Sequence, residues 1–300
     1  MRLAKGTLLK QEKYMLGLKV NFKKIVGIIK IIRPSNVLIS GLTISVAVLI
    51  FGGEGFDISR LALVAGIVGI LIDAGANVIN DFFDVEIDRI NKPHRPIPSG
   101  LVSKRFALFI YFVYTILGLL VASFLNKIAF MIVLFSSVVI FLYSYRLKRI
   151  PLVGNFTVAF ITGLAFIFAG SVVGNFKDAL FPFLFAFMIN FGREIIKDIE
   201  DIEGDLKSGV KTFPIVRGVN WAVAVSVSVF LVLIFATMIP YFVGIYNHLY
   251  FLIVLVVDVG LIFVIFSLLR DRSKRNLNRL SNILKFEMLV GLSAIYFGSL

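Results

Sequence analysis

Residues 60–88 read RLALVAGIVGILIDAGANVINDFFDVEID. This stretch begins as an apolar run of about 20 residues, the length that crosses a bilayer as a helix. It ends in three aspartates, Asp81, Asp84 and Asp88. The whole chain of 300 residues is 59% hydrophobic with a mean hydropathy of +0.95, which is more apolar surface than one soluble core buries. We therefore predict an all-α, polytopic membrane protein.

Nine apolar runs are long enough to span the membrane. They lie at roughly residues 35–53, 60–80, 106–124, 128–145, 151–174, 179–196, 219–245, 248–269 and 282–299. All but three of the 31 Lys and Arg residues precede the first run or lie in the second, fourth, sixth and eighth connections; the exceptions are Arg60, Lys127 and Lys177. Since positive loops stay inside, we predict a multi-pass protein of the cell membrane with a cytoplasmic N-terminus and an outside C-terminus.

The basic segment 1–33 has no compact apolar stretch followed by a small-residue cleavage site, so we do not expect a cleaved signal peptide. We predict an interfacial segment on anionic lipid, followed by a single transmembrane domain over residues 34–300. The net charge of +13 is then a topology signal. We expect the lipid bilayer as a partner, and neither nucleic acid nor a protein partner is indicated.

The aspartate motif occurs twice. Asp81, Asp84 and Asp88 recur 117 residues later as Asp198, Asp201 and Asp205, and Pro34 recurs at the same distance as Pro151. Four predicted helices separate the copies. The sequence therefore predicts two parallel four-helix pseudo-repeats plus a ninth helix, with both motifs at the cytoplasmic ends of the second and sixth helices.

The spacing i, i+3 and i+7 keeps the three acids of each motif within an arc of about 60° on one continuous helix. Asn77 precedes the first motif on nearly the same face, and Glu194 takes its place before the second. With no cysteine and two histidines, carboxylates are the available metal ligands, and they suit Mg²⁺. A Mg²⁺ ion held this way completes its shell with water and phosphate oxygens, so we predict a diphosphate ligand. The alternative is a solvated loop in which the acids pair with adjacent basic residues.

A diphosphate pocket also needs cationic side chains. The candidates near the motifs are Arg89, Lys92, Arg95, Tyr143, Arg146, Lys148, Arg193 and Lys197. Anchoring of the loops to lipid headgroups is the alternative role for the basic ones. Asp258 lies alone inside the eighth apolar run, where a buried, hydrogen-bonded packing role is favoured over a functional one.

These motifs resemble the UbiA superfamily of intramembrane prenyltransferases over nearly the whole chain. The matching stretches are Arg33–Asn36, Asn80–Asp88, Asn91–Gly100, Tyr143–Lys148 with Pro151 and Asn155, and Asp198–Asp205. The resemblance implies nine helices around a central cavity, with Mg²⁺ held by Asn77, Asn80 and the six aspartates. Of these, Asp84, Asp88, Asp201 and Asp205 would be catalytic. Arg33, Asn36 and Asn155 would join the eight residues named above in binding substrate.

Residues 193–205 are similar to the archaeal branch of that superfamily, the digeranylgeranylglyceryl phosphate synthases. This likeness implies a geranylgeranyl diphosphate donor, a geranylgeranylglyceryl phosphate acceptor and formation of an ether bond of archaeal lipid. We predict that Lys148, with Arg146 or Arg33, helps hold the acceptor phosphate. The alternatives are a related prenyltransferase with an aromatic or chlorin acceptor, and a cation-coupled transporter.

Overall fold

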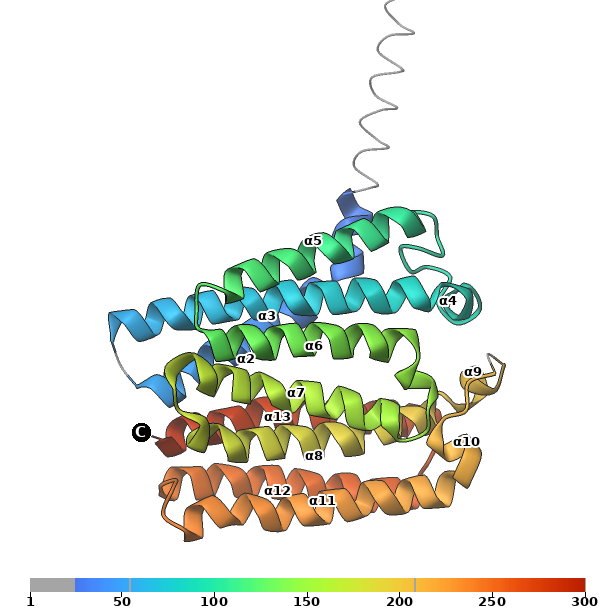
Figure 1. The fold of residues 1–300 in the computed structure, drawn as a ribbon. Coiled ribbons are helices and arrows are strands. Elements are labelled where there is room, and N and C mark those ends of the chain that lie inside the picture. Colours follow the sequence, from blue (N-terminus) through green and yellow to red (C-terminus); the bar gives the residue numbers. More distant parts are fainter. Residues whose placement is uncertain (1–24, 54, 208, 300) are drawn as a thin grey trace, which may run out of the picture.

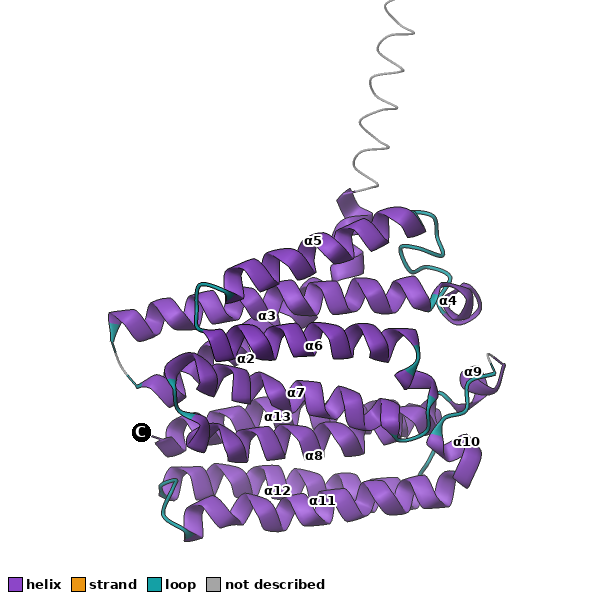
Figure 2. Ribbon diagram, in the orientation of Figure 1, coloured by secondary structure: helices purple, strands orange, loops and turns teal. Residues whose placement is uncertain are grey.

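The computed structural model describes residues 25–53, 55–207 and 209–299, and within them nine helices are long and apolar enough to cross a membrane (Figure 1). They are α2 (Pro34–Gly52), α3 (Phe56–Phe83), α5 (Lys104–Ala122), α6 (Lys127–Tyr145), α7 (Val153–Val173), α8 (Phe176–Glu200), α11 (Val219–Phe242), α12 (His248–Arg270) and α13 (Lys274–Ser299). The described residues form helices, turns and loops without a strand (Figure 2). The predicted all-α architecture is confirmed.

The predicted spans are confirmed in number and order within this part of the chain, and the largest difference is at the last one. It starts at Lys274, two turns before the predicted residue 282. These two turns are polar in sequence, but Leu277 and Leu280 are 1% and 0% exposed, so packing holds the helix together beyond its apolar run. Hydropathy alone marks the part of a helix that lies in lipid and misses such extensions.

The helices follow the repeat. In the first half α2 packs on α3, and α3 packs on α5 and α6; in the second, α7 packs on α8, and α8 on α11. The ninth long helix, α13, packs on α12 and α8. The first helix of each half follows a residue in the left-handed region, Arg33 with φ 55° and Leu152 with φ 62°. The prolines are less equivalent than predicted, because Pro34 is the first residue of α2 whereas Pro151 stands two residues before α7.

Each aspartate motif bends the chain at its middle acid, so the prediction of one continuous helical arc is wrong. α3 ends at Phe83, Asp84 has φ −90° and ψ 3°, and the short helix α4 (Val85–Asn91) follows. α8 ends at Glu200, Asp201 has φ −95° and ψ 3°, and α9 (Ile202–Lys207) follows. The same break at equivalent aspartates supports the repeat more strongly than the spacing does. It also places the third acid of each motif on a separate helix.

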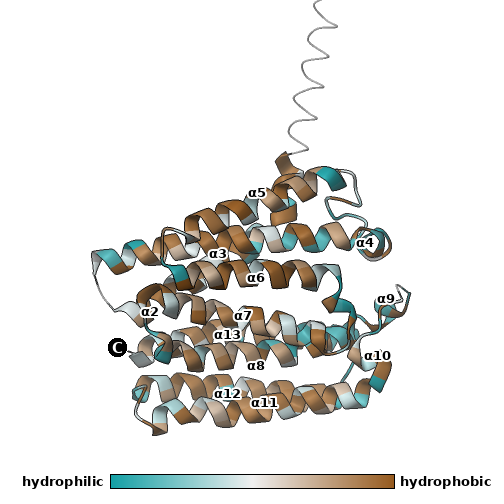
Figure 3. Ribbon diagram, viewed as in Figure 1, coloured by the Kyte–Doolittle hydropathy of each residue, from teal (hydrophilic) through white to brown (hydrophobic). Residues whose placement is uncertain are grey.

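Both motifs lie at one end of the helix bundle. α4, α9 and α10 (Phe213–Arg217) are all at this end, and the C-terminus is at the opposite end (Figure 1). Polar residues gather around α4, α9 and the neighbouring loops, while the long helices between the two ends are mostly hydrophobic (Figure 3). The interfacial prediction for residues 1–33 falls largely on residues 1–24, which lie outside the described residues. Residues 25–32 are helical.

The contact between α8 and α11 leaves no room for a side chain at Gly192. A Cβ atom there would lie 2.5 Å from Cε1 of Phe230, a ring that is 0% exposed. We expect Gly192→Ala to lower the free energy of unfolding by about 1–3 kcal/mol because the buried ring must shift. Thermal unfolding of the purified protein measures this. Gly291→Ala is the matched control, since nothing lies within 4 Å of a Cβ at this other helical glycine. Equal melting temperatures for the two variants would contradict the packing described here.

Candidate active site

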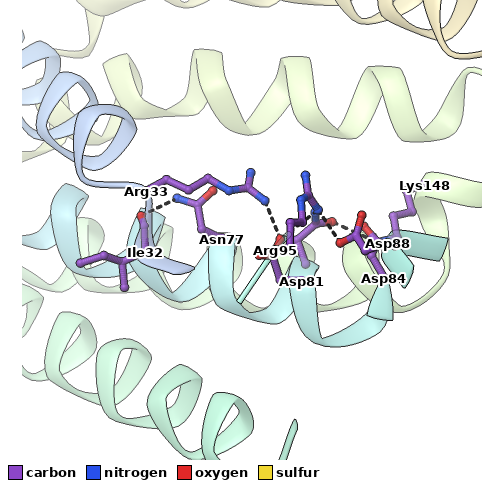
Figure 4. Close-up of polar contacts among 9 residues, drawn as sticks. Ile32, Arg33, Asn77, Asp81, Asp84, Asp88, Arg95 and Lys148 are labelled. Carbon is purple, nitrogen blue, oxygen red and sulfur yellow. Dashed lines mark hydrogen bonds and ion pairs between the residues drawn. The ribbon is translucent and has the colours of Figure 1, made fainter. Parts of the chain in front are cut away.

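The acids of the first motif are held by cationic side chains from three other parts of the chain (Figure 4). Arg33, just before α2, places Nη2 2.5 Å from Oδ1 of Asp81. Arg95, in the loop after α4, bridges two acids, with Nη1 3.1 Å from Oδ1 of Asp81 and 2.6 Å from Oδ2 of Asp88. Asp81 and Asp88 are buried, so these ion pairs replace lost hydration.

The middle acid of this motif binds a different cation. Lys148 lies in the 3₁₀ turn η1 (Leu147–Arg149) between α6 and α7. Its Nζ donates to Oδ1 of Asp84 at 2.6 Å and to Oδ1 of Asn80 at 3.0 Å. Burial lowers the pKa of Lys148, and the Asp84 carboxylate acts in the opposite direction. The first motif therefore carries three acids and three cations in direct contact.

Burial also shifts the pKa of the third acid in each motif. It raises the pKa of Asp88, against the lowering effect of Arg95. It raises the pKa of Asp205 to about 6, with a further increase from the Asp201 carboxylate. In the part of the chain that the structure describes, the ion pair at Asp88 has no counterpart at Asp205. In the second motif, the exposed Asp201 and the half-buried Asp205 therefore repel each other.

The second motif has few direct partners. Asp198 accepts a hydrogen bond of 2.8 Å from Nδ2 of Asn155, on α7. Asp201 is exposed and Asp205 is half-buried. Within the described ranges, no Lys or Arg forms an ion pair with any of these three aspartates. Among the described residues, the second motif thus lacks the direct ion pairs of the first, as expected of a cation site.

The two motifs act on each other electrostatically. The Asp84 carboxylate raises the pKa of Asp205, and Lys92 lowers it. The Tyr143 hydroxyl, on α6, lies within electrostatic reach of Asp84, Asp198 and Glu194. The sequence prediction that the repeats bring both motifs to one site is thus consistent with these interactions.

A cavity of about 1010 Å³ extends between the helices next to this site. Its polar lining includes nine of the predicted site residues: Arg33, Asn36, Asn77, Asn80, Lys92, Arg95, Tyr143, Arg193 and Lys197. The rest of its wall is mainly apolar, with Ile140, Phe166, Leu233 and Leu292 among its residues. The polar residues belong to elements that meet at the motif end of the bundle. The cavity therefore has the form needed for an amphiphile with a charged head and a hydrocarbon tail.

Other predicted site residues lie outside the cavity wall. The set comprises Asp81, Asp84, Asp88, Arg89, Arg146, Lys148, Asn155, Asp198, Asp201 and Asp205. Most of these lie in or contact the motifs, but Arg89 is exposed and pairs with Glu86 at 2.8 Å, and Arg146 is exposed. Asn77 donates through Nδ2 to the Ile32 carbonyl at 3.2 Å, which gives this predicted metal ligand a structural contact as well.

Lys285 is a cavity residue that the sequence reasoning did not select. It lies on α13 inside the predicted span 282–299, where an ionisable side chain is itself a signal of function. Asp258, the other ionisable group noted in a span, is buried and accepts a hydrogen bond of 3.1 Å from Oγ1 of Thr237. This contact agrees with the packing role favoured for Asp258.

The donor set fits Mg²⁺, although the protein alone does not enclose an ion. Nowhere in the described part of the chain do three His, Cys, Asp or Glu side chains converge to hold a metal. Carboxylate oxygens are nevertheless the ligands that Mg²⁺ prefers, and it usually keeps water and substrate phosphate oxygens in its shell. The repulsion between Asp201 and Asp205 is the kind that a divalent cation relieves. An ion at these motifs would thus be shared with a bound phosphate.

Known proteins with similar sequences and folds support one family. The UbiA prenyltransferase family matches residues 40–289. A digeranylgeranylglyceryl phosphate synthase of Methanobrevibacter smithii is 37% identical over 284 residues, covering 90% of this chain and 97% of the relative. The enzyme of the same name from Thermococcus kodakarensis is 35% identical over 272 residues, covering 91% and 97%.

Solved structures share the fold. A structure from work on digeranylgeranylglyceryl phosphate synthase in membranes is 32% identical and covers 92% of this chain and 98% of that one, with a TM-score of 0.79. A UbiA homologue from Archaeoglobus fulgidus bound to GPP and Mg²⁺ is 19% identical and covers 90% and 99%, with a TM-score of 0.70. The family match spans most of the chain and includes both aspartate motifs. The chain therefore belongs to the UbiA prenyltransferase family, a family of multi-pass membrane proteins.

Proposed function

We propose that this protein transfers a geranylgeranyl group from geranylgeranyl diphosphate to geranylgeranylglyceryl phosphate, with Mg²⁺ as cofactor. The observation that carries prenyl transfer is the pair of aspartate motifs beside one apolar cavity of about 1010 Å³. The choice of acceptor is supported by relatives named digeranylgeranylglyceryl phosphate synthase at 37% and 35% identity. The product would be a lipid with a second ether-linked chain, and pyrophosphate would be released.

The residues of the first motif suit the donor headgroup. Arg33 precedes this motif in the sequence and Arg95 follows it, and both contact Asp81; Lys148 contacts Asp84. When a diphosphate and its Mg²⁺ bind, these cations can also neutralise phosphate oxygens, since each has further N–H groups to donate. The six motif aspartates, with Asn77 and Asn80, would hold the metal, which supplies charge neutralisation of the leaving group.

The chemistry requires little else from the protein. The bond between prenyl C1 and the diphosphate oxygen breaks as Arg33, Arg95 and Lys148 stabilise the charge that develops on the leaving group. The acceptor hydroxyl oxygen then forms the new bond to C1, and its proton passes to a motif carboxylate or to pyrophosphate. The apolar wall of the cavity, which includes Phe166 and Leu233, excludes water that would otherwise capture the prenyl cation.

The test of the proposed function is an acceptor panel. Purified protein in lipid is given labelled geranylgeranyl diphosphate and Mg²⁺ with geranylgeranylglyceryl phosphate, its dephosphorylated form, or an aromatic acceptor such as a hydroxybenzoate or a quinol precursor. We expect a labelled ether product from the phosphorylated lipid at a rate at least about 10-fold above the others, because the contacts to the phosphate are lost with each of them. Preferred turnover of an aromatic acceptor would contradict the acceptor assignment and leave the donor chemistry in place.

The proposed orientation, with the N-terminus and site in the cytoplasm, gives a labelling prediction. The chain has no cysteine, so a single introduced thiol reports its own position. Lys92→Cys and Lys211→Cys, both at exposed positions on the motif end, are expected to react with an impermeant reagent only from the cytoplasmic side. Lys177→Cys, exposed near the start of α8, should react only from outside. The reverse pattern would show that the charge asymmetry does not set the topology of this protein.

A further inference from the structure

Three cationic side chains gather on the second half of the cavity, around one carboxylate. Arg193 and Lys197, on α8, both bond to Glu194: Arg193 Nη1 lies 2.9 Å from Oε1, and Lys197 Nζ lies 2.9 Å from Oε2. Lys285, on α13, lies within electrostatic reach of all three. Arg193, Glu194, Lys197 and Lys285 all line the cavity. We call these four residues the α8–α13 cluster.

Arg193 and Glu194 form the buried part of the α8–α13 cluster, and Lys197 and Lys285 form its exposed part. The side chain of Arg193 is only 11% exposed, and its Nε donates to the Ser281 carbonyl on α13 at 3.2 Å. Glu194 is 12% exposed, so its carboxylate fixes the positions of two cations. Such contacts cost hydration and conformational freedom that a lipid-anchoring side chain would keep. The arrangement indicates a preorganised binding site.

The cluster also has more positive than negative charge. Three cations face one carboxylate, whereas the first motif matches three cations to three acids. One turn further along α8 lies Asp198, which accepts a hydrogen bond from Asn155 and belongs to the second motif. A metal at that motif would take up its charge. The surplus in the cluster would then be available to a second anion.

The wall next to Lys285 fits the rest of a lipid. Beyond Lys285, α13 contributes the apolar side chains of Met288, Leu292 and Ile295 to the cavity wall. Glu287, the acid that precedes Met288 on this wall, is 7% exposed and packs against Gly260 of α12. A molecule with its phosphate at Lys285 would thus have hydrocarbon wall for its chain. An inorganic phosphate would not need this wall.

We propose that Arg193, Lys197 and Lys285 bind the phosphate group of the lipid acceptor. Of these residues, Lys285 is the one that serves the acceptor site and not the donor site. This inference rests on the proposed function, in which the acceptor carries a phosphate. The first-half cations that sequence reasoning assigned to that phosphate, Lys148 and Arg33, contact Asp84 and Asp81 of the first motif and are assigned here to the donor headgroup. The second anion needs cations of its own because it repels the donor diphosphate.

The test uses equilibrium binding of labelled geranylgeranylglyceryl phosphate to the full-length protein in lipid, without donor or Mg²⁺. Lys285→Ala is expected to weaken binding roughly 10- to 100-fold, the effect of losing one charged hydrogen-bond partner. Lys285→Arg should restore binding to within about 3-fold of wild type, since the charge returns. Binding of geranylgeranylglycerol, which lacks the phosphate, should be the same for all three proteins. Lys274→Ala, at the start of the same helix and outside the cavity wall, is the matched control.

Three results would overturn the inference: Lys285→Ala binding the phosphorylated lipid as wild type does, equal losses for both lipids, or no recovery with arginine. Steady-state kinetics give a second reading, in which Lys285→Ala raises KM for the acceptor about 10-fold and KM for geranylgeranyl diphosphate less than about 2-fold. An equal rise in both KM values would assign the cluster to the donor. If the proposed function itself were wrong, the wild-type protein would form no ether product. The binding experiment would still give its result in that case, because it does not depend on turnover.

Discussion

Asp84→Ala and Asp201→Ala are each expected to lower turnover by about 10²- to 10³-fold or more, because a metal ligand contributes several kcal/mol to stabilising the leaving group. The two residues occupy the same break in the two halves, with φ −90° and −95°. Asp84 contacts Lys148, and Asp201 raises the pKa of Asp205. Initial rates with geranylgeranyl diphosphate at saturating Mg²⁺ measure the effect.

The chain contains its own controls for these variants. Glu86 and Glu203 each stand two residues after the middle aspartate, and both are exposed. Glu86→Ala and Glu203→Ala remove an acid from the same short helices, so they should keep turnover within about 3-fold of wild type if surface charge has little effect. Equal losses in the Glu and Asp variants would indicate a general charge effect. Near-normal turnover of either Asp variant would show that its carboxylate is not a metal ligand.

Removal of Mg²⁺ is expected to have the second large effect. A chelator should lower turnover by at least about 10³-fold, since the diphosphate leaving group loses its main neutralising charge. Added Mg²⁺ should restore the rate, because the described residues form no enclosed metal site that would collapse without the ion. The protein should therefore keep its melting temperature in the chelator.

The melting temperature separates two interpretations of the chelator experiment. Loss of activity together with a large fall in the melting temperature would indicate a structural metal, which the geometry does not support. Unchanged turnover in the chelator would contradict the metal assignment itself. In that case the ion pairs at Asp81, Asp84 and Asp88 would be structural.

Much of the fold could be predicted because its signals are local. Membrane-spanning runs, charge asymmetry and the repeat of 117 residues are all visible in one sequence. The breaks at Asp84 and Asp201 could not be predicted, since neither Gly nor Pro marks them and helical spacing continues through both motifs. The extension of α13 to Lys274 depends on the burial of Leu277 and Leu280, which is a tertiary effect.

For the candidate site, the sequence suggested residue types but not the contacts between them. The sequence selected Arg33, Arg95 and Lys148, and the structure pairs them with the first motif. It did not indicate that Arg95 bridges Asp81 and Asp88, because a contact over a loop depends on how the chain folds back. Lys285 was missed for a similar reason: its neighbours Arg193 and Lys197 are far away in sequence and close only through the packing of α13 on α8.

The central claim, that the two motifs catalyse Mg²⁺-dependent prenyl transfer, is tested most directly by measuring two products at once. Proteoliposomes with purified protein receive labelled geranylgeranyl diphosphate, geranylgeranylglyceryl phosphate and Mg²⁺, and released pyrophosphate and ether-linked lipid are both quantified. We expect equal amounts of the two from wild type, and neither product above about 1% of the wild-type amount from Asp84→Ala or Asp201→Ala. Uptake of the labelled substrate without bond cleavage would instead indicate transport, and pyrophosphate without ether lipid would indicate a hydrolase.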